Sequence, residues 1–424
     1  MNSDFEFDLC VLGVGRVGLP LALSLIESGK SVVGLDRDEK ARKTINSGAM
    51  PFQEPGYDEL IARKALQVHS DPQVVARARA LVITVGTPLH THIETDLSQV
   101  RAVLEAVGPH LRAGQLICLR STVAPHTTRY VARWIAKSTG LVAGRDIWVA
   151  FCPERIVEGK AKEELRTLPQ VIGVEDDESF DRAAELFEGL APEVLRTNFV
   201  SAELVKLFNN VSRYVSFALA NHLALVADTF GANIFEIRHL ANHKYPRQGV
   251  ASPGFTAGTC LRKDFGMLNE WAAYPDLLLS AWKMNEFMPL FLVDHLKQRT
   301  QIHERRVAVL GYTFKAGTDD TRDSLAPKLL RYIERELPSE VRVSEPHIDG
   351  DITTDSGEVL KNWSPETALE SADCVFVATN HEEFGPVLAE FRKTHPEAWI
   401  ADLWNAGSAD KVFYRCCDVE EQND

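Results

Sequence analysis

The feature that most constrains the fold is a glycine pattern near the N-terminus, Gly13-Val14-Gly15-Arg16-Val17-Gly18. An apolar run, Phe7 to Leu12, precedes it and predicts a buried strand. A helical stretch from Leu19 to Ser28 follows, and a second predicted strand, Ser31 to Leu35, leads to Asp36. In a βαβ unit such glycines permit the tight turn, the close approach of backbone to a pyrophosphate and the helix–strand packing. The order strand, glycines, helix, strand, acid therefore predicts a dinucleotide site.

Asp36 also bears on the choice of dinucleotide. Its carboxylate suits the adenosine ribose hydroxyls and repels a 2′-phosphate, which favours NAD over NADP, while the neighbouring Arg37 argues weakly the other way. The plain alternative is a glycine-rich turn without a ligand. We predict an NAD site built from Gly13, Val14, Gly15, Arg16, Val17, Gly18, Asp36 and Arg37.

The α/β alternation continues with strands predicted at Ala80 to Val85, Gln115 to Leu119 and Asp146 to Phe151. Ligands of doubly wound sheets lie beyond the carboxyl ends of strands. The residues there are therefore site candidates, although each could also cap a helix or form a turn: Gly86, Thr87, Thr122 and Glu154. His90 and His92 have no third ligand nearby in the sequence, so we expect loop histidines and no metal site.

A long helix without glycine or proline is predicted from Ser201 to Phe230, with Ser201 as its capping residue and Gly231 at its end. Lys206, Asn210 and Arg213 share one face of it. Such a face is usually solvated, but asparagine is a poor residue for the middle of a helix, which favours a functional interpretation.

A second α/β region follows. Strands are predicted at Arg306 to Leu310, Glu340 to Ser344, Asp373 to Ala378 and Trp399 to Leu403, in βαβ order. We therefore expect an α/β protein with two Rossmann-like parallel-sheet domains joined by a long central helix. The predicted division is 1–196, 197–300 and 301–424.

The segment before Asp264 carries the third set of candidates. Small residues, among them Gly254 and Gly258, lead directly to Cys260, and Lys263 and Asp264 follow. A thiol becomes a nucleophile when a nearby cation or base activates it. The alternative is a loop and a helix whose cysteine is simply buried.

Composition excludes several classes of protein. The net charge of -14 argues against nucleic-acid binding but leaves room for an anionic small ligand. Seven scattered cysteines without a CxxC pair predict neither disulfides nor zinc, and suggest the cytoplasm. No apolar run is long enough for a membrane span, and no signal peptide is evident.

Taken together, these segments resemble the nucleotide-sugar 6-dehydrogenases, the family of UDP-glucose and UDP-N-acetylhexosamine dehydrogenases. The matching motifs cover nearly the whole chain in order: the Gly13–Gly18 pattern with Asp36, Glu54-Pro55-Gly56, Gly86-Thr87-Pro88, Ser121-Thr122-Val123, Pro153-Glu154-Arg155, Ala202 to Lys206 with Asn210, Cys260 with Lys263-Asp264, and Phe314-Lys315 with Asp320 to Ser324.

The resemblance implies oxidation of a sugar C6 alcohol to a carboxylate with two molecules of NAD in turn. Cys260 would add to the aldehyde, and the resulting thiohemiacetal would be oxidised to a thioester that water hydrolyses. Lys206 and Asn210 would stabilise the oxyanion. Asp264 would assist water or proton transfer, and Glu154 with Thr122 would position or deprotonate the water.

The same resemblance assigns binding roles and a UDP-binding function to the C-terminal domain. Cofactor contacts would include Gly86, Thr87, Thr122, Glu158, Lys263 and Arg322. Substrate contacts would come from Glu154, Arg155, Lys206, Asn210, Arg247, Phe255, Gly258, Phe314 and Lys315, with Arg247 or a similar arginine coming from the same or a neighbouring subunit. The family's central helix makes a dimer, so we expect a homodimer or a higher homo-oligomer.

Departures from the family pattern leave the sugar open. Ala257 stands where the family usually has a second glycine, and Leu261-Arg262 replaces the usual aromatic or aliphatic residue followed by proline. Tyr245-Pro246-Arg247 resembles the N-acetylhexosamine branch, whereas Lys263-Asp264 resembles the UDP-glucose branch.

Three alternative functions make different demands on the sequence. A single-step dehydrogenase of the 3-hydroxyacid or 6-phosphogluconate type needs neither Cys260 nor a second α/β domain. A catalytically silent NAD- or nucleotide-sugar-binding protein has the same fold, but a retired site is expected to lose some of its residues. A redox-sensing Cys260 predicts a resolving cysteine close in the sequence, and there is none.

Overall fold

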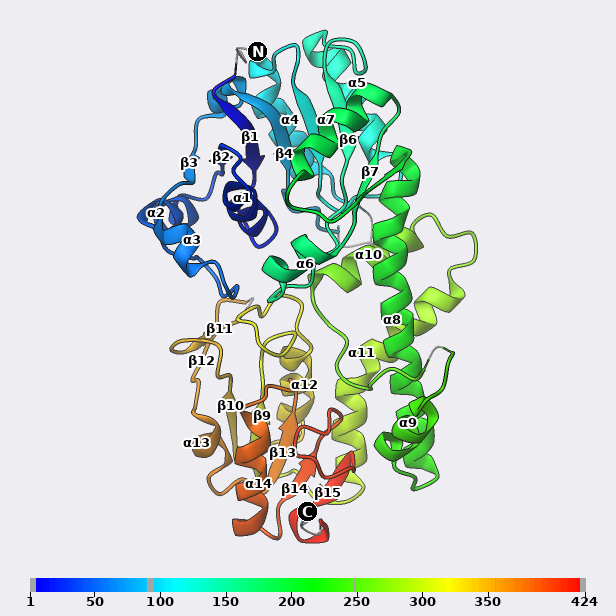
Figure 1. The fold of residues 1–424 in the computed structure, drawn as a ribbon. Helices are drawn as coiled ribbons and strands as arrows, with labels where there is room; N and C mark the ends of the chain where they lie inside the picture. The colour runs from blue at the N-terminus through cyan, green and yellow to red at the C-terminus, as the bar shows by residue number, and fades with distance from the viewer. Residues whose placement is uncertain (1–4, 90–94, 248, 355, 420–424) are drawn as a thin grey trace. The chain divides into compact units, whose positions relative to one another are not determined.

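The computed structural model describes residues 5–89, 95–247, 249–354 and 356–419 (Figure 1). His90 and His92 lie outside the described residues. The chain divides into two compact units, Met1–Asn210 with Gly266–Trp271, and Val211–Phe265 with Ala272–Asp424. Each unit is built on its own sheet, so the α/β class with two Rossmann-like sheets is confirmed. The three-part division at residues 196 and 300 stays a prediction.

The sheet of the first unit has the strand order β3-β2-β1-β4-β5-β6-β7-β8 within the described ranges, and β6 and β7 are its antiparallel neighbours. The strands are β1 Phe7–Leu12, β2 Val32–Leu35, β3 Gln67–His69, β4 Ala78–Ile83, β5 Leu116–Leu119, β6 Trp148–Phe151, β7 Gln170–Gly173 and β8 Val194–Thr197. The predicted strands are confirmed within a few residues. The sequence analysis missed β3, β7 and β8, which are short and lie toward the edges of the sheet.

Both faces of this sheet are covered by helices. Leu9 and Val11 belong to one apolar core, and Cys10 and Leu12 belong to another, because successive side chains of a strand point to opposite faces. The helices are α1 Gly18–Glu27, α2 Glu39–Ser47, α3 Asp58–Ala62, α4 Ser98–Val107, α5 Thr127–Thr139, α6 Ala161–Thr167 and α7 Asp177–Phe187, with 3₁₀ turns at Pro72–Arg77 and Gly108–His110.

The long helix α8, Phe199–Thr229, is confirmed, but its predicted cap is wrong. It begins before Ser201, and the side chain of Asn198 accepts a hydrogen bond from the Ser201 backbone N–H at 2.9 Å. Asn198 is therefore the residue that satisfies this helix end. The helix ends as predicted at Gly231, which has a left-handed φ of +64°.

The second unit contains a smaller sheet with the order β10-β9-β13-β14-β15. Four strands are parallel as predicted, and β15, which was not predicted, runs antiparallel at the edge. The helices and strands that follow α8 are α9 Ile234–Asn242, α10 Thr259–Asn269, α11 Asp276–Lys297, β9 Arg306–Leu310, α12 Ala326–Glu334, β10 Glu340–Ser344, β11 Ile352–Thr353, β12 Val359–Leu360, α13 Pro365–Leu369, β13 Cys374–Val377, α14 Phe384–Thr394, β14 Trp399–Ala401, β15 Phe413–Arg415 and the 3₁₀ turn Cys416–Asp418. Helix α10 belongs in part to each unit, and Cys260 lies within it.

No helix in the described part of the chain combines the length and the apolar character that crossing a membrane requires.

A buried amide on α8 holds the loop that precedes Cys260. Asn221, fully buried, donates to the Gly254 carbonyl at 3.0 Å and accepts from the Gly254 N–H at 2.9 Å. It also donates to Asn285 of α11 at 3.0 Å, and Asn285 in turn donates to the Tyr214 carbonyl. The Asn221 side chain thus supplies the hydrogen-bond partners that the backbone of Gly254, in an irregular segment, does not find in a helix or sheet.

We expect Asn221→Ala to lower the free energy of unfolding by about 3 kcal/mol, because it removes three hydrogen bonds and leaves buried partners unsatisfied. Urea denaturation followed by circular dichroism measures this. Ser212→Ala, an exposed position on the same helix, is the matched control and should change stability by less than about 0.5 kcal/mol. Equal stability of the two variants would contradict the anchoring role of Asn221.

Candidate active site

The glycine turn between β1 and α1 has the geometry that a dinucleotide site needs. A Cβ on Gly18 would lie 2.0 Å from the Gly13 carbonyl oxygen, and Gly13 itself has a φ of +94°. A Cβ on Gly15 would meet no atom within 4 Å. Gly13 and Gly18 are therefore required by the fold of the turn, whereas the space beside Gly15 is open to a ligand.

Asp36 lies at the end of β2, as predicted, and faces this turn. Its Oδ2 accepts from the Val14 N–H at 2.8 Å and its Oδ1 accepts from the Asp38 N–H at 2.9 Å. The carboxylate is held against the turn between β1 and α1, where the predicted ribose contact places it.

A cavity of about 330 Å³ adjoins the carboxyl ends of β1, β2 and β4. This volume is within the range of small-ligand sites. Five predicted cofactor residues line the cavity: Gly13, Gly15, Asp36, Arg37 and Gly86. Residues that were not predicted also line it, among them Ser70, Pro72, Thr84, Gln99, Ala102 and Val103. Their only signal in the sequence was their position after a strand or on a helix beside the site.

Arg16 and Glu158, both predicted cofactor residues, form an ion pair in the first unit. The Arg16 guanidinium also lies 5.0 Å from the centre of the Phe52 ring. Glu54 fixes the segment after Glu158, because its buried carboxylate accepts from the Gly159 N–H at 2.9 Å and the Ala161 N–H at 3.0 Å. The Glu54 carboxylate of the Glu54-Pro55-Gly56 motif therefore holds the backbone from Gly159 to Ala161 in place.

Thr87 and Thr122 meet at the neighbouring ends of β4 and β5. The Thr87 hydroxyl donates to the Thr122 carbonyl at 2.5 Å, and the Ser121 hydroxyl donates to the Val85 carbonyl at 2.7 Å. This arrangement agrees with the prediction that polar residues gather at the carboxyl edge of the sheet.

Glu154, at the end of β6, is buried and bound to Arg120 at the end of β5. Its Oε2 accepts from Arg120 Nε at 2.8 Å and also from Nη2 of the same guanidinium. Its Oε1 accepts from the backbone N–H groups of Arg155 at 2.7 Å and Ile156 at 2.9 Å. Protein donors thus fill the acceptor sites of the carboxylate.

The sequence analysis missed Arg120, whose side chain is 1% exposed. Its Nη1 donates to the Gln170 side chain of β7 at 2.8 Å and to the Cys152 carbonyl at 3.2 Å. The neighbouring Arg155 side chain donates to the Pro169 carbonyl, and burial lowers the pKa of its guanidinium from the ordinary value. The ends of β5, β6 and β7 are therefore joined by one polar network.

Lys206 and Asn210 on α8 are buried, whereas Arg213 is exposed, so the predicted shared face is not uniformly solvated. One turn before Lys206, Glu203 accepts from the backbone N–H groups of His126 and Thr128, each at 2.7 Å. Burial raises the pKa of the Glu203 carboxyl. These bonds join the first turns of α8 to the start of α5 within the first unit.

In the second unit, Cys260 lies on the first turn of α10 and is exposed, which argues against the alternative of a buried cysteine. A helix N-terminus favours an anion. On the next turn, Lys263 Nζ lies 3.5 Å from an oxygen of Asp264, and the Asp264 side chain is buried. All seven cysteines lie in described ranges, and of them only Cys260 and Cys417 are exposed.

The loop before Cys260 packs on the segment that follows β9. A Cβ on Gly258, whose φ is +93°, would lie 2.5 Å from the Phe314 ring. The Gly258 N–H donates to the Asp323 carbonyl at 3.1 Å, and Arg262 donates to the Asp323 carboxylate at 3.1 Å. Gly258 and Phe314, both predicted substrate residues, are therefore in contact, and Arg262 is a residue that the sequence analysis did not assign.

The remaining predicted residues of the second unit are less tightly grouped. Arg322 pairs with Asp320, with Nη2 at 2.6 Å from a carboxylate oxygen. Phe255 is buried and Lys315 is partly buried. Arg247 is exposed, with its guanidinium 4.4 Å from the centre of the Tyr245 ring. The division of the chain assigns Cys260 to the second unit and Lys206, Asn210 and Glu154 to the first.

Comparison with known proteins matches three successive regions of the chain to one family. Residues 7–191 match the NAD binding domain of the UDP-glucose/GDP-mannose dehydrogenase family. Residues 200–286 match the central domain of that family, and residues 308–409 match its UDP binding domain.

The chain is 35% identical over 391 residues to the UDP-N-acetyl-D-mannosamine dehydrogenase of Pyrococcus horikoshii, which covers 89% of this chain and 90% of that protein. The solved structure of the P. horikoshii UDP-D-ManNAc dehydrogenase has a TM-score of 0.83 at 34% identity, covering 91% of this chain and 92% of that one. A UDP-glucose dehydrogenase from Pyrobaculum islandicum has a TM-score of 0.81 at 28% identity, with the same coverage of 91% and 92%.

Substitutions in the glycine turn should separate binding from folding. We expect Gly15→Ala to weaken NAD binding about tenfold or more, because its methyl group would occupy the open space beside the turn in which the cofactor is expected to lie. Its stability should change by less than about 0.5 kcal/mol. Isothermal titration calorimetry and thermal melting measure the two effects.

Gly18→Ala is the contrasting variant. Its methyl group would overlap the Gly13 carbonyl oxygen, and we expect it to destabilise the protein by about 2 kcal/mol. Normal NAD affinity in a well-folded Gly15→Ala protein would contradict the placement of the cofactor at this turn.

Proposed function

The chain belongs to the UDP-glucose/GDP-mannose dehydrogenase family, and from this premise we propose that it oxidises the C6 alcohol of a UDP-N-acetylhexosamine of the mannosamine type to the uronic acid. It is an NAD-dependent UDP-sugar dehydrogenase. The observation that carries the two-step proposal is the exposed Cys260 on the first turn of α10, behind a loop of constrained glycines.

Gly13, Gly15 and Asp36 would hold NAD, which would supply the hydride acceptor for each of the two oxidations at C6; the first oxidation also releases the C6 hydroxyl proton. After the first, the Cys260 thiolate adds to the aldehyde carbonyl and a proton completes the thiohemiacetal. Loss of the second hydride and of the hydroxyl proton forms a thioester. Water then attacks the thioester carbon and expels the thiolate, so that one alcohol and one water yield one carboxylate and two reduced cofactors.

We assign the proton and charge handling to the residues that the family resemblance selects. Lys206 and Asn210 stabilise the developing oxyanion. Asp264 assists proton transfer. Glu154 neither deprotonates nor directly binds the water, because protein donors already occupy its oxygens; it acts by orienting the strand end that lies next to the Thr122 segment.

The N-acetylmannosamine type of sugar is favoured by the similarity to the UDP-N-acetyl-D-mannosamine dehydrogenase of P. horikoshii. UDP-glucose is the second candidate, supported by the likeness to the Pyrobaculum enzyme and by the Lys263-Asp264 pair. The alternatives of a single-step dehydrogenase and of a silent binding protein predict one reduced cofactor per substrate and none, respectively.

We also propose three parts for the chain, at 1–196, 197–300 and 301–424, and a homodimer or higher homo-oligomer that uses α8. Exposed apolar side chains support the assembly, since Leu219 on this helix is 57% exposed and Phe230, which directly follows it, is 81% exposed. A cytoplasmic location suits the exposed Cys260, which must stay reduced to act.

Cys260→Ser tests the thioester mechanism. The wild-type enzyme should form two NADH per UDP-sugar, and the variant should lose net turnover by about a thousandfold or more, because the thiolate is the nucleophile. NADH absorbance with chromatography of the sugar products measures both. Cys417→Ser, which changes the other exposed cysteine, should behave as wild type. One NADH per sugar, unaffected by Cys260→Ser, would establish the single-step alternative.

A substrate panel tests the sugar. We expect kcat/KM for UDP-N-acetylmannosamine to exceed that for UDP-glucose by about tenfold or more, because pocket contacts discriminate by about 1–3 kcal/mol. A preference for UDP-glucose would overturn the N-acetylhexosamine assignment and leave the two-step chemistry intact.

A further inference from the structure

The loop between β9 and α12 contains two of the predicted substrate residues, and its start is fixed at the carboxyl end of the second sheet. The buried carboxylate of Glu345 accepts from the backbone N–H groups of Tyr312 at 2.8 Å and Thr313 at 2.9 Å. Nε2 of the buried His381 lies 3.1 Å from this carboxylate and 3.1 Å from the Thr313 hydroxyl. The first residues of the loop are therefore held by side chains of the same unit.

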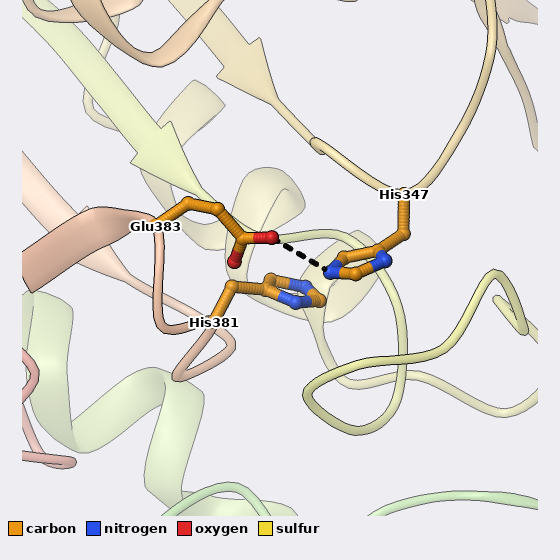
Figure 2. A group of neighbouring side chains, drawn as sticks. All are labelled: His347, His381 and Glu383. Carbon is orange, nitrogen blue, oxygen red and sulfur yellow. Dashed lines mark ion pairs between the residues drawn. The ribbon is translucent and has the colours of Figure 1, made fainter. Parts of the chain in front are cut away.

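His381 also belongs to a group of possible metal ligands, which Figure 2 shows with His347, Glu383 and the dashed ion pair between these two. Suitable ligand atoms of the three residues lie within 4.8 Å of one another. The two imidazole rings are stacked, however, with centres 4.6 Å apart and planes 30° apart. Lone pairs of stacked rings lie in nearly parallel planes and do not converge on one ion. The geometry therefore favours a role in holding the loop.

The last residues of the same loop reach the segment that carries Cys260. Asp323 has a left-handed φ of +53°, a conformation that residues other than glycine seldom adopt. Its carbonyl accepts from the Gly258 N–H at 3.1 Å, and its carboxylate accepts from Arg262 Nη1 at 3.1 Å. Gly258 and Arg262 stand two residues before and two residues after Cys260. Asp323 thus contacts the chain on both sides of the thiol.

The Arg262 guanidinium has a second carboxylate within reach. Its Nε lies 3.1 Å from Oε1 of Glu286 on α11, whose side chain is 12% exposed. The other oxygen of Glu286 accepts from Lys328 Nζ of α12 at 2.8 Å. A guanidinium can serve two carboxylates at once, because its N–H groups point in fixed and different directions. Arg262 therefore joins the first turn of α10 both to the loop after β9 and to α11.

An ordinary ion pair near the surface is the plain alternative, since such pairs contribute little to stability. The position of this one argues for more. Gly258, which donates to Asp323, has a φ of +93° and is packed so closely on Phe314 that a Cβ would lie 2.5 Å from its ring. A shift of Asp323 is therefore passed on to the chain that leads to Cys260. Proline, which the resembling family usually has in place of Arg262, could form neither ion pair.

We propose that Arg262 is a positioning residue for Cys260, and that it acts by clamping the first turn of α10 to Asp323 and Glu286. The proposal rests on the proposed function, in which the Cys260 thiolate adds to an aldehyde. This addition needs the sulfur at near-attack distance from the carbonyl carbon, so a small displacement of the helix turn lowers its rate. Hydride transfer in the first oxidation does not involve the thiol. Loss of the clamp should therefore slow the second oxidation and spare the first.

The 6-aldehyde of UDP-N-acetylmannosamine, or of UDP-glucose if the substrate panel favours that sugar, separates the two oxidations. Its reduction by NADH reverses the first oxidation and needs no thiol, whereas its oxidation by NAD passes through the thioester. Arg262→Met keeps a long side chain but removes its charge. We expect this variant to slow the oxidation about tenfold and to leave the reduction within about twofold of wild type. NADH absorbance measures both rates on the full-length protein.

Asp323→Asn tests the assignment of the partner. Asparagine keeps the size of the side chain and tolerates a left-handed φ, but it has no charge to pair with Arg262. We expect it to slow the oxidation of the aldehyde about threefold. The double variant should be no slower than Arg262→Met alone, because the two residues act as one pair. Losses that multiply in the double variant would contradict the clamp.

Lys297→Met is the matched control, because it removes a cation of the same unit from an ion pair with Glu336 at 2.8 Å. It should leave the oxidation and the reduction of the aldehyde at wild-type rates. Calorimetric binding of NAD and of UDP should be unchanged in all variants, which verifies folding. Equal slowing of the two reactions in Arg262→Met would mean a general loss of structure and would overturn the positioning role.

Hydrogen exchange of the peptide 255–260, followed by mass spectrometry, reports the clamp without any substrate. Exchange should be about tenfold faster in Arg262→Met and unchanged in Lys297→Met. Faster exchange in Arg262→Met, together with a wild-type protein that oxidises neither UDP-sugar nor aldehyde, would overturn the proposed reaction and leave the clamp standing. Unchanged exchange, or oxidation of the aldehyde by Arg262→Met at the wild-type rate, would overturn only the role of Arg262.

Discussion

Carboxylates that accept backbone N–H bonds, two of them buried and one partly buried, hold loops beside both sheets. Asp36 binds the glycine turn at Val14, Glu54 binds the segment at Gly159, and Glu345 binds the loop at Tyr312. A parallel sheet ends in loops whose N–H groups have no strand partner, and leaving such groups buried and unpaired costs about 1–3 kcal/mol each. A carboxylate can satisfy several of them at once, and its charge strengthens each bond.

A buried carboxylate also needs a partner for its own negative charge. Arg120 is this partner for Glu154, and His381 is this partner for Glu345. The first pair joins the ends of adjacent strands through a guanidinium. The second pair uses an imidazole. The two units therefore use related anchors.

These anchors bear on the chemistry. The proposed two-step oxidation would keep a reactive carbonyl bound to Cys260 while the cofactor is exchanged, so the loops that hold nucleotide and cofactor would have to keep their conformation during the exchange. In the second unit the constrained glycines fix the loop before Cys260, and in the first unit protein donors fix the carboxylate of Glu154, so each group is oriented before substrate arrives.

Short-range sequence patterns were enough to predict both sheets, the dinucleotide turn and the long helix. These depend on periods of two and 3.6 residues and on glycine conformations, which are local properties. The family resemblance added the roles of Cys260, Lys206 and their neighbours. Ser201 was chosen as a cap because serine is a good capping residue, but Asn198 was an equally good choice and tertiary packing extended the helix to it.

The sequence by itself determined the α/β class, the NAD turn with Asp36 and the position of the candidate nucleophile. Only the tertiary structure decided which distant polar residues are paired: Arg120 with Glu154, Glu345 with His381, and Arg262 with Asp323. Each of these pairs joins elements separated in the chain, and no local pattern records which carboxylate will be buried beside which cation. That choice is made when the strands align, because desolvation penalises every buried charge that lacks a partner at that place.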